Sequence, residues 1–422
     1  MPLRFDILHR STTTRARLGR VATPHGVFDT PAFMPVGTRG SVKGLLPGMV
    51  AQIGAQIILG NTYHLLLRPG PDLIERLGGL QKFTGWNGPM LTDSGGYQAF
   101  SLAHTNKIDD DGVTFKSIVD GSLVTITPES AMQIQNKLGA DIIMAFDDCP
   151  PSVIEEHPRR TLGEQEWEVE GSAPAPGRAE PRARARGSVD RIRIANERTV
   201  RWLKRCAAEH ARLGGHEKRS LFGIVQGGTD LVARSWSAER VAGIDLPGYA
   251  IGGVAVGEGS ADIARVVEHT APLLPDAKPR YLMGVGYERD LLAAVRAGVD
   301  MFDCVLPTRN GRNANAFTPN GQIRLRNAKY SDDPLPIEPG CDCPSCAPSP
   351  EFPWASRGDS PFSRAYIRHL FFAEEMLGPI LVSLHNLRYF QRFMADLRQT
   401  IRSEDWNGFL TRWPAARPVS GA

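Results

Sequence analysis

Residues 298–313, GVDMFDCVLPTRNGRN, set one carboxylate, Asp303, in an apolar run that a proline and a basic, glycine-containing segment follow. A short apolar run bounded by turn residues is typical of a buried strand, so we predict a strand over residues 300–306 that leads into a turn and loop. Burying an uncompensated carboxylate costs several kcal/mol, so Asp303 must be paired or functional. Arg309 and Arg312 in the loop suit contacts with phosphates or bases. An acid beside a cationic loop is what attack on a nucleic-acid sugar requires.

Strand-like apolar runs recur along the chain, and helical periodicity separates them, as over residues 192–206 and 261–267. About seven strand–helix units in series predict an α/β protein with a (β/α)8 barrel of the TIM type, and an open doubly wound sheet is the alternative. Residues 1–40 predict a β-rich opening and residues 42–52 a short helix. The predicted strands are residues 55–60, 90–93, 142–147, 221–226, 249–254, 280–284 and 301–305.

The composition divides the chain into regions. We expect the barrel in residues 1–335, a metal-binding subdomain with C-terminal helices in residues 336–401, and a tail in residues 402–422. Residues 155–187 are rich in Glu, Pro, Ala, Gly and Arg, which predicts a disordered insertion. Residues 347–361, rich in Pro and Ser, form a second predicted insertion.

Length and charge limit the classes of function. The chain has 422 residues, 41% of them hydrophobic, which is enough for a large core. The net charge of +3 permits a nucleic-acid partner without requiring one. The start has no apolar segment of signal-peptide length, and no run of about 18 apolar residues predicts a membrane span. We therefore expect a cytoplasmic protein. In that compartment the cluster Cys341-x-Cys343-x-x-Cys346 favours a metal over disulfides.

The predicted strands end repeatedly in a polar or special residue. In (β/α)8 barrels the C-terminal strand ends carry the chemistry, so this pattern predicts one shared site. An aspartate after a strand is also a common helix N-cap, which is the alternative for any single position. These residues are Asp93, Asp147, Gln226, Gly253, Met283 and Asp303.

Residues 93–98, DSGGYQ, follow a predicted strand. Their two glycines let the backbone approach a ligand, and Tyr97 offers a flat ring for stacking. A Gly-rich turn with a core tyrosine is the alternative.

Two other strand ends suit a purine. Asp147 can accept hydrogen bonds from the amide and amino edge of the base, and Gln226 can donate to its carbonyl. A glutamine in a turn is the alternative for Gln226, and it is the favoured one when this position is taken alone. Met283 suits the other face of the ring, with core packing as the alternative. For Asp148 we prefer a role as a cap or salt-bridge partner.

These segments together resemble the bacterial tRNA-guanine transglycosylases, the queuine tRNA-ribosyltransferase family, from residue 5 to about residue 401 with two interruptions. The resemblance implies that Asp303 is the nucleophile and Asp93 the general acid/base. Cys149 and Val256 match the bacterial pattern, and Glu258 would favour a cationic aminomethyl group. The family usually has Leu where this chain has Val254. The implied base-binding residues are Asp93, Ser94, Gly95, Gly96, Tyr97, Asp147, Gln226, Gly253, Val254 and Met283.

The resemblance also implies two segments that contact RNA. In the first, this chain has Tyr-Glu-Arg where Lys-Pro-Glu is common, and we expect Arg289 to replace the lysine. The implied residues are Gly284, Val285, Gly286, Tyr287, Glu288, Arg289, Asp290, Thr308, Arg309, Asn310, Gly311 and Arg312.

The cysteine cluster is similar to the zinc site of the family, whose fourth ligand is a histidine in a His-Asn pair. That residue is His385 here, and His369 is a competing candidate. Three sulfurs and one nitrogen close a tetrahedral shell, so Cys341, Cys343, Cys346 and His385 would hold one structural zinc ion per chain.

The implied reaction replaces guanine at wobble position 34 with 7-aminomethyl-7-deazaguanine, a step of queuosine biosynthesis. The implied substrates are tRNAs for Asp, Asn, His and Tyr, which have GUN anticodons. The reaction is a double displacement through a covalent intermediate and needs no redox cofactor. The family also suggests a homodimer. A non-catalytic tRNA-binding partner subunit and a barrel glycosidase acting on sugars are the alternatives.

Overall fold

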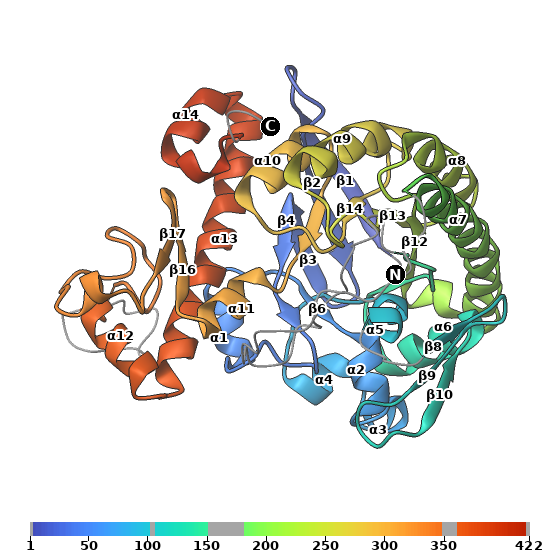
Figure 1. Ribbon diagram of the computed structural model, residues 1–422, viewed down its shortest axis with the longest axis horizontal. Helices are drawn as coiled ribbons and strands as arrows, with labels where there is room; N and C mark the ends of the chain where they lie inside the picture. Colours follow the sequence, from blue (N-terminus) through green and yellow to red (C-terminus); the bar gives the residue numbers. More distant parts are fainter. Residues whose placement is uncertain (1–2, 102–105, 151–180, 348–360, 419–422) are drawn as a thin grey trace.

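The computed structural model describes residues 3–101, 106–150, 181–347 and 361–418, and a barrel of parallel strands forms its centre (Figure 1). The strands are hydrogen-bonded in the order β4-β15-β14-β13-β12-β11-β7-β6-β5. β4 and β5 are two halves of one segment that Pro35 interrupts, and they pair with β15 and β6. In the described chain this segment therefore closes an eight-membered ring, which confirms the (β/α)8 barrel and excludes the open sheet. The strands are β4 (Ala32–Met34), β5 (Val36–Gly37), β6 (Ile58–Gly60), β7 (Met90–Thr92), β11 (Ile142–Met144), β12 (Ser220–Val225), β13 (Gly248–Ile251), β14 (Arg280–Leu282) and β15 (Met301–Asp303).

Several predicted elements are longer than the observed ones. The strand predicted over residues 300–306 ends at Asp303, and helix α11 (Leu306–Arg312) begins three residues later. Pro307 fits the first turn of that helix because its missing N–H has no partner there in any case. The segment predicted as a cationic loop is therefore a helix, and both of its arginines lie on that helix. The helix predicted over residues 42–52 is likewise confined to α1 (Pro47–Gln52).

Side chains alternate between the barrel interior and the helical layer. In β15, Met301 packs with the interior cluster and Phe302 with the outer core. Because successive side chains of a strand point to opposite faces, Asp303 returns to the interior at the carboxyl end. In three other strands a predicted site residue likewise follows an interior core residue by two positions. Asp93 follows Leu91, Gln226 follows Ile224, and Met283 follows Tyr281.

An antiparallel sheet covers the opposite end of the barrel. It consists of β1 (Arg4–Arg10), β2 (Arg17–Thr23) and β3 (Gly26–Thr30), and its Val21 and Phe28 join the interior cluster. The buried Arg17 donates from Nε to Asp300 at 2.9 Å, and the backbone N–H of Arg280 donates to the same carboxylate at 2.7 Å. This pairing compensates both buried charges and fixes the start of β15.

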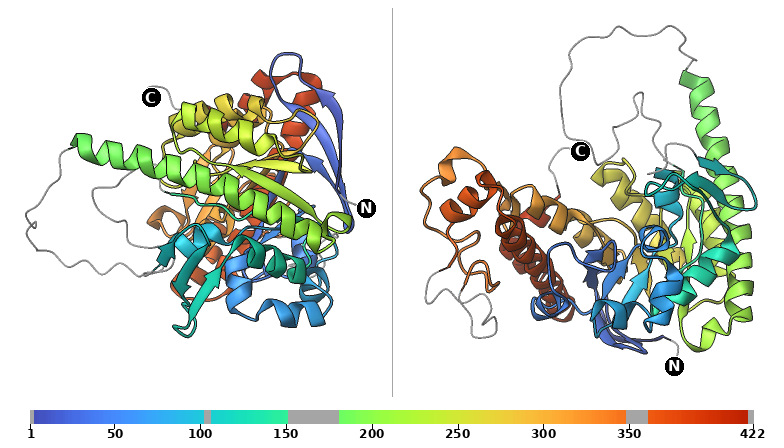
Figure 2. Two further views of the ribbon diagram at one scale, coloured as in Figure 1. Left: turned by 90° about the vertical axis from the view of Figure 1, so that its right-hand side faces the viewer. Right: turned by 90° about the horizontal axis from the view of Figure 1, so that it is seen from below.

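Helices follow most barrel strands and surround them. Figure 2 shows that α7 (Pro181–Arg212) runs along the outside of the barrel. Residues 181–187, which we predicted as disordered, are its first turns; the rest of that insertion, residues 155–180, lies outside the described residues, as does the second predicted insertion except for its end residues 347 and 361. The other helices around the barrel are α2 (Thr62–Leu67), α3 (Pro71–Arg76), α4 (Leu80–Thr84), α5 (Gly96–Ser101), α6 (Pro128–Leu138), α8 (Leu231–Ala242), α9 (Ser260–Thr270) and α10 (Glu288–Arg296), and a sheet of β8 (Asn106–Ile108), β9 (Val113–Lys116) and β10 (Leu123–Ile126) lies beside them.

A C-terminal lobe lies beside the barrel (Figure 1). It contains β16 (Asn315–Thr318), β17 (Gly321–Arg324), α12 (Arg364–Phe372) and the long α13 (Leu377–Ser403). Phe390 of α13 stacks on Phe33 of β4 at 4.8 Å between ring centroids, which joins the lobe to the barrel. The region predicted as a tail contains α14 (Trp406–Arg412), whose buried Phe409 packs against Phe393. None of the helices in the described ranges has the length and apolarity that a bilayer crossing needs.

Candidate active site and metal centre

A cavity of about 520 Å³ opens at the carboxyl ends of the barrel strands, and its volume suits a nucleobase-sized ligand. The residues predicted at six strand ends all line it. They are Asp93, Asp147, Gln226, Gly253, Met283 and Asp303, and Ser94 and Tyr97 line it as well.

The carboxylate of Asp303 is held on one side only. Its Oδ1 accepts hydrogen bonds from the Tyr281 hydroxyl at 2.6 Å and from the Gly284 backbone N–H at 2.8 Å. Among the described residues its Oδ2 has no partner. Removal from water raises the pKa of Asp303, and the two hydrogen bonds oppose that rise. The arrangement fixes the carboxylate and leaves one oxygen for a ligand in the cavity.

Asp93 lies in a more enclosed place. Asn61 and Gln98 donate from their side-chain amides to its Oδ2, the latter at 2.8 Å, and the Thr62 N–H donates to Oδ1 at 2.7 Å. Burial raises the pKa of Asp93 to about 6, and the negative charge of Asp303 adds to the rise while the hydrogen bonds oppose it. A carboxyl group with a pKa near 6 can both give and take a proton near neutral pH.

Asp147 and Gln226 are joined to each other. Gln226 donates from Nε2 to one carboxylate oxygen at 2.7 Å, and the Ser94 hydroxyl donates to the other at 2.8 Å. Burial raises the pKa of Asp147 to about 6. The Gln226 side chain also hydrogen-bonds to the Cys149 thiol. Neighbouring Asp148 forms salt bridges with Arg191 and Arg198, as we preferred from the sequence.

The remaining predicted base-binding residues form the wall behind the cavity. Gly96 lies so close to the backbone that a Cβ there would stand 2.8 Å from the Asp147 carbonyl oxygen. Gly95 has a φ of +77°, which disfavours other residues. Neither glycine, nor the buried Val254, is among the residues that line the cavity. Tyr97 is 42% exposed, so its ring is accessible for stacking.

The residues predicted to contact RNA divide into three groups. The buried ones are packed against the protein: Gly311 contacts α13, where a Cβ would meet Ser383 Oγ at 2.5 Å, and Glu288 accepts a hydrogen bond from Tyr389 at 2.8 Å. Thr308 is also buried. Asn310 and Arg312 are partly exposed on α11. Those at the cavity are Gly284, Val285, Gly286, Tyr287, Arg289, Asp290 and Arg309.

Three residues for which we predicted no role, Asn61, Gln98 and Tyr281, also line the cavity. Asn61 follows the interior residue Leu59 by two positions, so the alternation that places Asp93 would have placed it too. Tyr281 is itself an interior residue of β14, and no local signal distinguishes it from a core tyrosine.

Four buried side chains in the C-terminal lobe converge on one point. Nδ1 of His385 lies 3.7, 3.6 and 3.3 Å from the sulfurs of Cys341, Cys343 and Cys346. Tetrahedral coordination of zinc by these atoms requires N–S separations of about 3.5 Å. Nε2 of His385 lies 2.7 Å from the Phe317 carbonyl oxygen and donates to it, which leaves the Nδ1 lone pair toward the sulfurs. The donor set therefore fits a closed metal site, and His369 is not part of it.

The sequence matches a known protein family over most of its length. A family model described as queuine tRNA-ribosyltransferase matches residues 11–163 and 182–419. The chain belongs to the queuine tRNA-ribosyltransferase family. It is 46% identical over 419 residues to the queuine tRNA-ribosyltransferase of Symbiobacterium thermophilum. The aligned region covers 98% of this chain and 92% of that protein. It is also 46% identical over 416 residues to the one of Thermus thermophilus, with 99% and 94% covered.

The match to the queuine tRNA-ribosyltransferase family is interrupted at residues 164–181. These residues lie inside the insertion predicted over residues 155–187, so this piece has no counterpart in the family model. The segments that contribute residues to the cavity at the strand ends and to the cysteine–histidine cluster all fall within the matched ranges.

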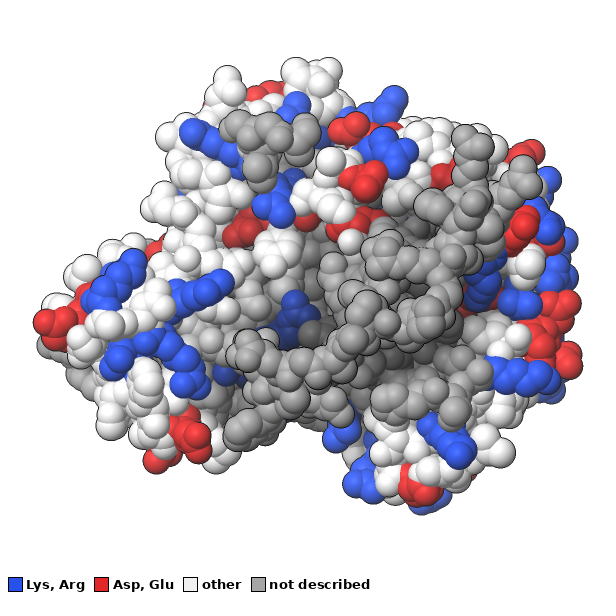
Figure 3. All heavy atoms as spheres, in the orientation of Figure 1, with Lys and Arg blue, Asp and Glu red and all other residues white. Residues whose placement is uncertain are grey.

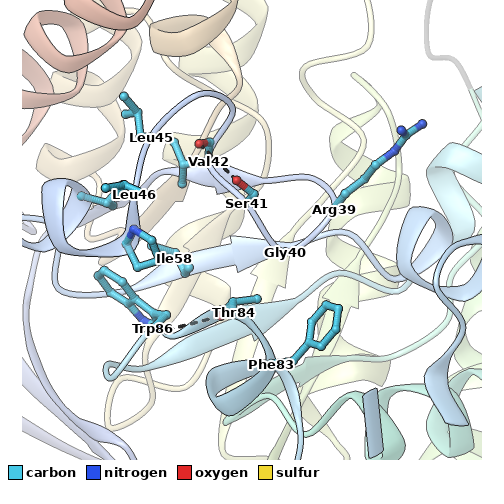
Figure 4. Close-up of a pocket in the computed structure, with 12 residues that line it drawn as sticks. Arg39, Gly40, Ser41, Val42, Leu45, Leu46, Ile58, Phe83, Thr84 and Trp86 are labelled. Atoms are coloured by element: carbon cyan, nitrogen blue, oxygen red, sulfur yellow. Dashed lines mark hydrogen bonds between the residues drawn. The ribbon is translucent and has the colours of Figure 1, made fainter. Parts of the chain in front are cut away.

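A second cavity of this queuine tRNA-ribosyltransferase family member lies outside the barrel mouth and is mainly apolar. It has a volume of about 290 Å³ and lies between α1, α4 and β6. Figure 4 shows Leu45, Leu46, Ile58 and Trp86 around it, with Arg39 at its edge. Leu46 is 64% exposed and Phe83 is 37% exposed. Exposed apolar groups around a pocket are typical of a surface that a partner covers.

The cluster geometry predicts that Cys343→Ser removes the bound metal and destabilises the C-terminal lobe. Elemental analysis of the purified wild type should find about one metal ion per chain, and the variant should have almost none and a lower melting temperature. Cys206→Ala is the matched control, since Cys206 is buried elsewhere and should leave the metal content unchanged. A metal-free wild type would contradict this assignment.

Proposed function

We propose that this protein is a tRNA-guanine transglycosylase, a pentosyltransferase that replaces guanine at wobble position 34 with 7-aminomethyl-7-deazaguanine in queuosine synthesis. One observation carries the proposal: a carboxylate with one free oxygen and a second carboxylate with a pKa near 6 line the same base-sized cavity. Family membership supports it independently.

In the first displacement, Oδ2 of Asp303 attacks C1′ of the nucleotide, the C1′–N9 bond breaks, and guanine leaves with a proton from Asp93. Tyr281 and Gly284 bind the other oxygen and so direct Oδ2 toward the substrate. In the second displacement, N9 of the incoming base gives its proton to Asp93 and attacks C1′, and the bond to Asp303 breaks. Asp93 ends with the proton that it began with, and two inversions retain the configuration at C1′.

The cavity walls suit a 7-aminomethyl-7-deazaguanine. Asp147 would accept from the amide and amino edge of the base, the amide of Gln226 and the N–H of Gly253 would bind its carbonyl, and Tyr97 and Met283 would contact its ring. Glu258 also lines the cavity; its Oε2 accepts from Val256 N–H at 2.8 Å, while its buried Oε1 has no partner among the described residues. That oxygen would accept a hydrogen bond from a cationic aminomethyl group.

The substrate RNA would bind across the mouth of the barrel, with its target base extruded into the cavity. Arg309 and Arg289 line the rim, and Arg289 donates from Nε to Ser260 at 2.7 Å, a position from which it can replace the usual lysine. Figure 3 shows Lys and Arg side chains over the lobe of α12, β16 and β17 on the same face, and the exposed residues there include Arg324 and Arg326. Such cations suit the RNA backbone. We extend the proposal to tRNAs for Asp, Asn, His and Tyr, and to a cytoplasmic location.

The two alternatives account for fewer observations. A non-catalytic partner subunit would not need two carboxylates in one cavity. A glycosidase that acts on sugars explains the two carboxylates. It does not explain why Asp147 and Gln226 together present hydrogen-bonding groups that suit the edge of a purine. Exchange of labelled guanine separates all three.

We propose zinc as the metal and a structural role for it. Three thiolates and one imidazole are typical of zinc sites, and a complete set of four ligands leaves no open position for substrate. The site lies between α13 and the residues before α12, so it would hold the lobe together beside α11.

We further propose a homodimer that covers the apolar surface around Leu46 and Phe83. Light scattering should give twice the 46.1 kDa of one chain, and Leu46→Asp should shift the protein toward the monomer because it places a charge in that surface. Val232→Asp is the matched control, since Val232 is 80% exposed on α8 and away from that surface. A wild-type monomer at micromolar concentration would contradict the proposal.

The reaction itself is tested by incorporating labelled guanine into an anticodon stem-loop RNA. The wild type should exchange guanine, and Asp303→Asn should lower kcat at least about 10³-fold because the amide cannot act as the nucleophile. Asp148→Asn is a control, since Asp148 pairs with arginines outside the cavity lining. Hydrolysis of carbohydrate without exchange would support the glycosidase instead.

The environment of Asp93 predicts the pH dependence of this exchange. The first displacement needs protonated Asp93 and the second needs ionised Asp93, so the exchange rate should fall on both sides of about pH 6, with an acidic limb set by the second displacement. Asn61→Ala removes a hydrogen bond that favours the ionised form, so the pKa should rise and the acidic limb should move to higher pH. Asn136→Ala, which changes a residue paired with Arg219 outside the cavity lining, should leave the profile unchanged. An unmoved acidic limb in Asn61→Ala would show that another group controls it.

A further inference from the structure

A guanidinium group lies buried behind the base-binding wall and forms no salt bridge in the described part of the chain, although the charge of Glu258 acts on it from a distance. Arg234, on α8, has 0% exposure and forms no salt bridge there. A buried cation without a carboxylate is costly unless its N–H groups are all satisfied. The contacts of Arg234 therefore need an explanation that stability alone does not provide.

The guanidinium binds backbone carbonyl oxygens of two separate strand ends. Its Nε donates to Gly228 at 2.8 Å and its Nη1 to Val225 at 3.0 Å, both at the end of β12. Nη1 also donates to Gly252 at 2.7 Å, and Nη2 donates to Gly253 at 2.8 Å, both after β13. One side chain thus joins the loop that follows Gln226 to the loop that contains Gly253.

These contacts fix the direction of two peptide groups. In a trans peptide the C=O and the next N–H point to opposite sides. Because the carbonyls of Gly252 and Gly253 point at Arg234, the N–H groups of Gly253 and Val254 point away from it. Among the described residues neither N–H has an acceptor, and Gly252 and Gly253 both line the cavity. Gly253 also has a φ of +62°, a conformation that glycine adopts without steric cost.

We propose that Arg234 is a positioning residue for base recognition: by holding these carbonyls it presents the backbone N–H of Gly253 to the C6 carbonyl of the base. This inference rests on the proposed function, because it assigns the cavity to a guanine-type base. Arg234 also lies behind the N–H groups that would bind the base carbonyl. Its positive charge there makes these groups stronger hydrogen-bond donors toward the cavity. Specificity for a 6-oxo purine is therefore built partly from a residue that does not touch the ligand.

The test compares two bases that differ at the recognised group. Guanine has the C6 carbonyl and 2-aminopurine lacks it, and the inhibition constants of both are measured against exchange into the stem-loop RNA. Arg234→Lys keeps the charge but cannot span the four carbonyls, because an ammonium has three donors at one point. In this variant guanine should bind at least about tenfold more weakly, while 2-aminopurine and the KM for RNA should change less than about twofold.

Arg240→Lys on the same helix is the matched control, because Arg240 is 41% exposed at its side chain and stacks on Trp236. Circular dichroism and metal content establish that the variants are folded. If Arg234→Lys does not fold, Arg234→Met is measured in its place. If the binding of both bases weakens equally, Arg234 has only a structural role and the proposal is overturned. Unchanged guanine binding would overturn it as well. A wild type that neither binds guanine nor exchanges it would refute the proposed function instead.

Discussion

Two hydrogen bonds to a single oxygen of Asp303 are the contacts on which the rest of the site depends. Tyr281 and Gly284 hold Oδ1, so the carboxylate cannot rotate freely and Oδ2 remains toward the cavity. The barrel supplies this arrangement because β14 and β15 are adjacent parallel strands, which brings Tyr281 beside the last residue of β15. Burial then makes the nearby carboxylates reluctant to ionise together, and one of them becomes available to carry a proton. The proposed nucleophile and the proposed proton carrier thus differ in environment rather than in chemical type.

The strand that carries Asp303 is fixed at both ends. At its start, Asp300 is bound by the buried Arg17 of the N-terminal sheet and by the backbone of Arg280. After its end, α11 packs closely on α13 through Gly311, and α13 also carries His385 of the metal cluster. Distant parts of the chain, the opening sheet and the metal-binding lobe, therefore act on one short strand. Displacement of a nucleophile by 1 Å can cost about 10²-fold in rate, so this support has a catalytic consequence.

The sequence predicted what depends on short-range pattern. Apolar runs that end in Asp93, Gln226 or Asp303 identified both the barrel and its carboxyl-end residues, since strand geometry places every second side chain inside. The helix α11 was missed because Pro307 and Gly311 are poor helix formers and packing on α13 stabilises the helix instead. The carbonyl contacts of Arg234 were also beyond reach, because they join loops that are distant in the chain. Several predicted strands extend past the carboxyl ends of the observed ones, because the apolar sequence continues beyond the last hydrogen bond of the barrel.

The central claim is that Asp303 forms a transient bond to the ribose. The most direct measurement is the mass of the denatured protein after rapid quenching with a stem-loop RNA, followed by mapping of the modified peptide. The account predicts a protein–RNA adduct on the peptide that contains Asp303, which disappears when a competing purine base is added before the quench. An adduct on a different residue, or active exchange that never yields an adduct, would contradict it.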